Sequence, residues 1–142
     1  MQDLSREEYR GLAEFRYQIR LFLGFSEEQV RAMGMEPQQH QMLLAIKGLP
    51  EGATATIGEL AERLQLKHHS TVELANRLER LGYLAREVSK KDRRQVIVRL
   101  TPSGATVLRK LSLAHHQELE TAGPALAKAL RAIARQHGAN AA

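Results

Sequence analysis

Two short helical patterns followed directly by a hairpin pattern constrain the fold of this chain more than any other feature. Apolar residues recur at every third or fourth position over 56–64, and again over 68–82 after a break of three residues. Gly82 is typical of a helix stop. The runs 83–88 and 95–100 then favour strands, with a charged segment between them. Helix, helix and hairpin in this order predict a winged helix-turn-helix.

The rest of the chain is predicted to be helical. Ser26, with Gln29 three residues later, has the pattern of a capping box, and Gly123-Pro124 has the pattern of a helix break. The fold class is therefore mainly α with a small β-hairpin wing. The further helices are expected over 5–24, 26–34, from Pro37 to about residue 48, over 102–121 and over 125–136.

The composition excludes several classes of protein. The chain has no cysteine, which excludes disulfides, thiolate catalysis and zinc-finger folds. No apolar stretch approaches the ~20 residues of a membrane span, and the charged start is unlike a signal peptide, so we expect a cytoplasmic protein without a membrane partner. There is no glycine-rich phosphate loop and no HExxH motif, so we expect neither an enzyme nor a cofactor.

Positive charge is concentrated in the predicted helix-turn-helix and wing. The whole chain has 21 basic and 16 acidic residues, a net charge of +5. Residues 67–99 hold nine basic and four acidic residues, so this window carries the whole excess. Such concentration is typical of nucleic-acid binding, because contacts with phosphates release counterions. A solvated basic surface is the alternative that charge alone leaves open.

The second predicted helix has one apolar and one polar face. Its apolar stripe is expected to be buried and comprises Thr71, Leu74, Ala75, Leu78 and Leu81. At 100° per residue, the opposite face has donors and acceptors suited to base edges and phosphates. An asparagine amide there can contact adenine through two hydrogen bonds. An ordinary solvated face is the alternative. The polar residues are His68, His69, Ser70, Glu73, Asn76, Arg77 and Arg80.

The sequence resembles the MarR family of transcription regulators over about residues 54–112. The resemblance begins with Ile57-Gly58-Glu59-Leu60-Ala61 and runs on from Arg77 through Leu84. It continues through Arg86, Asp92-Arg93-Arg94, Val98-Arg99-Leu100-Thr101 and Gly104. The Asp-Arg-Arg wing followed by Leu-Thr-x-x-Gly is the most specific part of this match.

The resemblance implies a single MarR-like domain that works as a homodimer. Residues 1–36 and 102–137 would form the dimerisation helices, and residues 37–101 the DNA-binding core. In such proteins a wing arginine enters the minor groove, a role that falls to Arg93 or Arg94, and Asp92 would tether a neighbouring arginine. With Thr56, Lys90 and Lys91, these residues complete the expected DNA-contacting set.

The resemblance also implies the function. We expect a sequence-specific regulator of transcription, acting as a repressor on a pseudo-palindromic operator in duplex DNA and released by a small aromatic or anionic effector. Where relatives often have a basic residue on the recognition helix, this chain has Glu73, which would either accept from a cytosine amino group or pair with Arg77. The alternative is a winged-helix adaptor that binds another protein.

The terminal helices have more apolar surface than a small winged core can cover. This surplus independently indicates a two-fold dimer. The residues expected to face a partner chain are Leu12, Phe15, Ile19, Phe22, Leu108, Leu111 and Leu119.

Two further sites are considered, one for an effector and one for a metal. Arg16, Arg20 and His40 are candidates to receive an anionic effector. His40, His115 and His116 are the candidate metal ligands, but two adjacent histidines on a helix point about 100° apart and do not chelate from one face. We therefore expect no metal.

Overall fold

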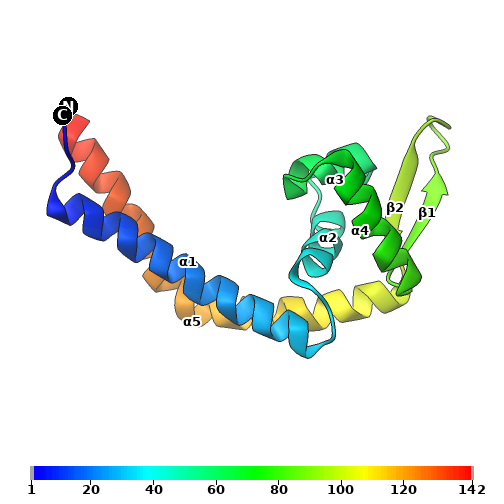
Figure 1. The fold of residues 1–142 in the computed structure, drawn as a ribbon, viewed down its shortest axis with the longest axis horizontal. Coiled ribbons are helices and arrows are strands. Elements are labelled where there is room, and N and C mark those ends of the chain that lie inside the picture. The colour runs from blue at the N-terminus through cyan, green and yellow to red at the C-terminus, as the bar shows by residue number, and fades with distance from the viewer. Residues whose placement is uncertain (1, 142) are drawn as a thin grey trace. The chain divides into compact units, whose positions relative to one another are not determined.

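The computed structural model describes residues 2–141, and the side chains of residues 2–135. It consists of two compact units: the terminal-helix unit, residues 1–29 and 113–142, and the winged unit, residues 30–112. Figure 1 shows the order of the elements along the chain. They are α1 (Arg6–Ala32), α2 (Pro37–Lys47), α3 (Ile57–Leu64), α4 (His68–Arg80), β1 (Leu84–Val88), β2 (Val96–Leu100) and α5 (Pro102–Ala141).

The predicted break at Ser26 is wrong, because α1 is one continuous helix. The capping box is at Ser5 instead, whose hydroxyl accepts from the Glu8 backbone N–H at 3.1 Å while Glu8 accepts from the Ser5 N–H at 2.7 Å. A capping pattern acts only where the chain enters a helix. Ser26 lies inside one, and Gly24 alone costs the helix only about 1 kcal/mol relative to alanine.

The predicted break at Gly123-Pro124 is also wrong, since α5 continues through Pro124. A proline inside a helix removes one backbone donor and crowds the preceding turn, at a cost of about 3 kcal/mol. The helix hydrogen bonds before and after it remain available. In a helix of 40 residues this local loss does not end the helix.

The winged unit is built around one apolar core. Met42 and Leu43 of α2, Leu60 of α3 and Leu78 of α4 are all fully buried in it. The first turns of α5 complete it, because Leu108 and Leu111 belong to the same cluster. The expectation that these two leucines face a partner chain is therefore wrong. Both leucines lie in the first turns of α5, directly after β2, and this part of the helix belongs to the winged unit.

The end of α4 fixes where the wing begins. Gly82 has a positive φ of 83°. The Tyr83 N–H donates to the Leu78 carbonyl at 2.9 Å and the Gly82 N–H to the Glu79 carbonyl at 3.0 Å, which is the Schellman arrangement. Leu81, expected in the buried stripe, is exposed because it lies at this cap, after the last turn of α4.

The wing is a two-stranded antiparallel hairpin. Its register runs from Leu84 opposite Leu100 to Val88 opposite Val96. The segment before α3 is attached to it, because the Val98 N–H donates to the Ala55 carbonyl at 2.9 Å. The hairpin is thus connected to the start of α3 as well as to the end of α4.

None of the helices described over residues 2–141 is both long enough and apolar enough to cross a membrane.

Candidate nucleic-acid interface

The polar face of α4 lies on the surface of the winged unit, as its helical phase predicts. His68, His69, Glu73, Arg77 and Arg80 are exposed. The predicted apolar stripe, apart from its last leucine, is buried on the other side of the helix. Of the remaining predicted residues, Ser70 and Asn76 are half-buried.

Four of these α4 residues surround a shallow cavity of about 290 Å³: Glu73, Asn76, Arg77 and Arg80. Two guanidinium groups therefore lie beside one carboxylate. Among the described residues, Glu73 makes no ion pair with Arg77. Of the two roles considered for Glu73, the structure thus leaves its carboxylate available as an acceptor at this cavity.

Asn76 is held from the wing by a residue to which sequence reasoning gave no role. Arg86 of β1 donates from Nη2 to the Asn76 amide oxygen. Its Nε lies 3.4 Å from Oε2 of Glu79, one α4 turn further on. The amide oxygen therefore already accepts one hydrogen bond within the protein, so in a two-bond contact with adenine it would have to share its lone pairs between Arg86 and the base. No local pattern reveals a contact between residues ten positions apart.

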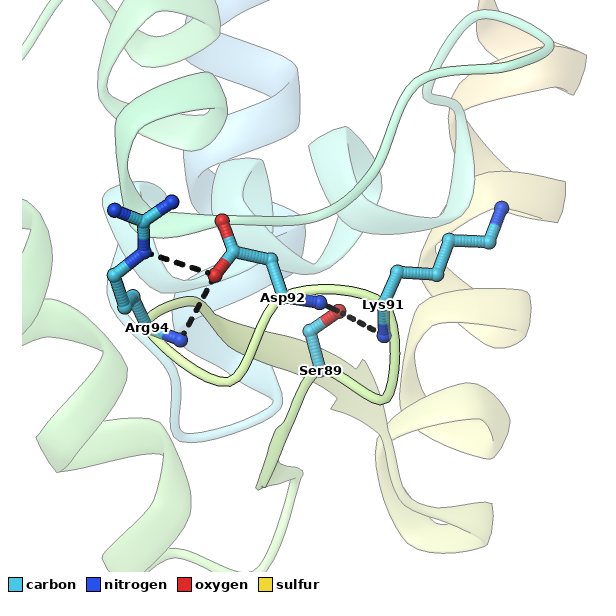
Figure 2. Close-up of polar contacts among 4 residues, drawn as sticks. All are labelled: Ser89, Lys91, Asp92 and Arg94. Carbon is cyan, nitrogen blue, oxygen red and sulfur yellow. Dashed lines mark hydrogen bonds and ion pairs between the residues drawn. The ribbon is translucent and has the colours of Figure 1, made fainter.

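The wing tip is ordered by one serine and one aspartate, which Figure 2 shows. The hydroxyl of Ser89 accepts from the backbone N–H groups of Lys91 and Asp92 at 3.2 and 3.3 Å. Oδ1 of Asp92 accepts from the Arg94 backbone N–H at 3.1 Å and from its Nε at 3.2 Å. The tether expected of Asp92 is present, and its partner is Arg94.

Cations surround this ordered tip. Lys90, Lys91 and Arg93 are exposed, and the side chain of Arg94 is 92% exposed even though Asp92 holds its inner end. An exposed guanidinium with a fixed base loses less conformational freedom on binding than one on a mobile loop. Ser89 helps to order the tip, but the sequence analysis assigned it no role. No local pattern marks it as different in function from the charged residues around it.

A second cavity, of about 380 Å³, lies between the helix starts and the wing. Its lining includes Thr56 and Gly58 at the start of α3, His68 at the start of α4, and Arg94. The Thr56 hydroxyl accepts from the Glu59 N–H at 3.2 Å, as the cap of α3. Its own O–H hydrogen remains available, so helix starts, a histidine and an arginine all present donors to this cavity.

The candidate effector and metal residues fall in different units. Arg16 and Arg20 are exposed on α1 in the terminal-helix unit, whereas His40 is buried on α2 in the winged unit. His115 packs edge-on against Phe22 and Phe25, with ring centres 6.2 Å apart in both cases. Among the described residues there is no group of three side chains arranged to hold a metal ion.

Comparison with known proteins also indicates a winged helix-turn-helix. Residues 33–95 match the model of the MarR family. YfiV of Bacillus subtilis, an uncharacterized HTH-type transcriptional regulator, is 30% identical over 98 residues, which are 69% of this chain and 59% of YfiV. The chain spans about half the length of the curated relatives it matches.

Solved structures share the fold. AbsC of Streptomyces coelicolor, a MarR family transcriptional regulator, has a TM-score of 0.74 at 20% identity, over 98% of this chain and 99% of AbsC. A mutant of Escherichia coli MarR complexed with operator DNA has a TM-score of 0.62 at 23% identity, over 83% of this chain and 85% of that one. With its helix-turn-helix and its hairpin, this chain has the winged-helix fold of MarR family proteins, and its residues 33–95 match the model of that family.

Proposed function

We propose that this protein is a sequence-specific DNA-binding regulator of transcription. One observation carries the proposal: the polar face of α4 and the ordered basic wing belong to one compact unit and hold the chain's excess positive charge. An α-helix fits the major groove, and an arginine on an ordered hairpin suits the adjacent minor groove. That a MarR protein of this fold has been solved with operator DNA supports the same role.

Each predicted contact has a role in this proposal. On α4, Glu73, Asn76, Arg77 and Arg80 would face base edges or phosphates. On the wing, Arg94 would enter the minor groove, because Asp92 already orders it, while Lys90, Lys91 and Arg93 would contact the backbone. Thr56 and His68 would bind a phosphate between the helix starts and the wing, with His69 and Ser70 next to them.

We further propose that the protein acts as a homodimer. In the terminal-helix unit, large apolar side chains remain on the surface of the single chain, and such a surface is typical of an interface. A two-fold dimer would cover them and would present two recognition helices about one DNA turn apart, ~34–36 Å. The exposed residues are Leu4, Tyr9, Leu12, Tyr17, Leu21, Leu23, Leu113, Leu119 and Leu130.

Regulation would be by repression, in the cytoplasm. A dimer bound to its operator excludes other proteins from the same DNA, which is the simplest means of repression. Release by a small anionic effector, with Arg16, Arg20 or His40 as contacts, completes the proposal. The family resemblance supports these finer points.

The dependence of duplex binding on salt tests the central proposal. If each protomer contacts several phosphates, raising the salt from about 50 to about 200 mM should weaken binding by roughly 10³-fold. The operator itself comes from selection out of a random duplex pool. Binding that is insensitive to salt, or a pool that yields no common sequence, would contradict the proposal and favour a protein-binding adaptor.

A further inference from the structure

Arg86 connects the wing to the recognition face of α4. It lies in β1 opposite Val98, and its side chain is only 26% exposed. Its guanidinium contacts two α4 residues one turn apart, the amide oxygen of Asn76 and the carboxylate of Glu79. Arg86 therefore does not face solvent as an ordinary surface cation would.

The chemistry of this contact fixes which way the Asn76 amide points. A guanidinium group has five N–H donors and no acceptor. An amide turned the other way would direct its NH₂ group at these donors, so the oxygen must face Arg86. The Asn76 Nδ2 group, with its two hydrogens, is then the part of the amide that Arg86 leaves unengaged.

We propose that Arg86 is a positioning residue that engages the oxygen side of the Asn76 amide and leaves its NH₂ group as the part presented to a base, and that the α4 cavity thereby selects guanine over adenine. This inference rests on the proposed DNA-binding function. The cavity is lined by Asn76 together with Arg77, Arg80 and the single acceptor Glu73. Three of its four side chains thus offer donors.

The donor pattern of the base pairs explains the selection. In the major groove guanine presents two acceptors, N7 and O6, whereas adenine presents one acceptor and the N6 amino donor. Donors from Asn76 and a neighbouring arginine match both guanine acceptors. The cytosine of the same base pair offers its N4 amino group, which the Glu73 carboxylate can accept.

Three variants test the inference in the full-length protein, each used to select duplexes from a random pool that is then sequenced. Asn76→Asp keeps an oxygen facing Arg86 but removes the donor. Arg86→Leu removes the group that orients the amide. Arg99→Leu is the matched control, since it removes one cation from the same hairpin, where Arg99 pairs only with Glu87 at 3.5 Å among the described residues.

We expect wild type to select guanine at one position of each half-site. Asn76→Asp and Arg86→Leu should lower the preference for guanine over adenine there by about tenfold, the effect of one good base contact. Arg99→Leu should keep the wild-type base preference and lose only overall affinity. A merely structural role for Arg86 would lower affinity for all duplexes alike without changing the preferred base.

The outcomes separate this inference from the function on which it rests. If wild type selects no common sequence, the DNA-binding proposal fails and the inference with it. If wild type selects an operator and both Asn76→Asp and Arg86→Leu keep its base preference, the inference alone is overturned. If circular dichroism shows Arg86→Leu to be unfolded, Asn76→Asp decides, because it retains Arg86 and its contacts.

Discussion

The two units of the molecule differ in how much apolar surface each covers for itself. The winged unit contains a cluster of twelve buried apolar residues, each at most 5% exposed. In the terminal-helix unit, among the residues whose side chains are described, Ala129 is the only buried apolar residue, and it is 6% exposed. Leucines and tyrosines of its two helices remain on the surface.

In the proposed dimer, this difference indicates which unit depends on the second chain. A unit with its own core can fold from the burial of its own side chains, at about 25 cal/mol per Å² of apolar surface. A pair of helices with little buried surface obtains that stabilisation from an interface, and its stability then depends on protein concentration. The winged unit should therefore respond to core mutations, and the terminal-helix unit to changes at its surface.

The largest expected effect is at Leu111, which is 2% exposed in the core of the winged unit. Leu111→Ala should lower the free energy of unfolding by about 2–5 kcal/mol, because it removes buried contacts and leaves a cavity. Amide hydrogen exchange of α3 and α4 is the measurement, since it reports on the winged unit separately.

Leu113→Ala is the matched control, two residues further along α5 and 55% exposed. It should leave exchange in α3 and α4 within about 0.5 kcal/mol of wild type. Equal effects of the two substitutions would show that the winged unit has no independent core, and the contrast between the two units would be lost.

At the surface of the terminal-helix unit, Leu12→Asp should weaken dimerisation by about 100-fold. The change replaces roughly 1.5–3 kcal/mol of apolar burial with a charge. Operator affinity should fall with it, although Leu12 is not expected to touch DNA. Light scattering beside a gel-shift titration measures both.

Hydrogen exchange in α4 should stay at the wild-type rate in Leu12→Asp, unlike in Leu111→Ala. A wild-type protein that is monomeric by light scattering and still binds its operator tightly would rule out this account of the terminal-helix unit.

The sequence predicted the winged unit well, because its elements begin and end at local signals. Thr56 caps α3, and Gly82 adopts the positive φ that ends α4. The errors arose where a local signal competed with a long helix. Ser26 and Pro124 have the patterns of a helix start and a helix break, yet α1 and α5 continue through both.

The candidate site could be predicted in part, for the same reason. Helical phase gives the exposed face of α4, and the charged run gives the wing tip. The contact between Arg86 and Asn76 joins a strand to a helix, and no periodicity reports on it. Likewise Leu108 and Leu111 share the helical spacing of Leu119, so spacing alone did not show that the first two lie in the winged core.

Glycine substitutions test the same comparison between the two units, and we expect them to change the free energy of unfolding by less. A Cβ on Gly104 would overlap the backbone carbonyl of Tyr83, so the start of α5 lies directly against the turn after α4. Gly104→Ala should lower the free energy of unfolding by about 1–3 kcal/mol through this overpacking. Thermal denaturation followed by circular dichroism measures it.

Gly24 provides the opposite case in the terminal-helix unit. A Cβ there meets nothing within 4 Å, and the residue lies inside α1. Gly24→Ala should therefore raise stability by about 0.5–1 kcal/mol, because glycine is a poor helix former. Destabilisation by Gly24→Ala in the dimer would mean instead that a partner helix approaches closely at this position.

The smallest expected effect on stability is at the wing tip, where Asp92 holds the almost fully exposed Arg94. Asp92→Ala should change the free energy of unfolding by less than about 0.5 kcal/mol, since exposed ion pairs contribute little. The direction of its effect on DNA affinity distinguishes a role in charge from a role in positioning Arg94. Removing an acid raises the net positive charge, so electrostatics alone predicts tighter binding.

If the tether positions Arg94, affinity should instead fall by about twofold to fivefold, because the guanidinium must be ordered on binding. Glu87→Ala is the control: it makes the same change in charge on the same hairpin, at a glutamate paired with the exposed Arg99 rather than at the tip. It should leave affinity unchanged or raise it slightly. Equal gains in the two variants, measured by fluorescence anisotropy on one operator duplex, would show that the wing acts through its charge alone.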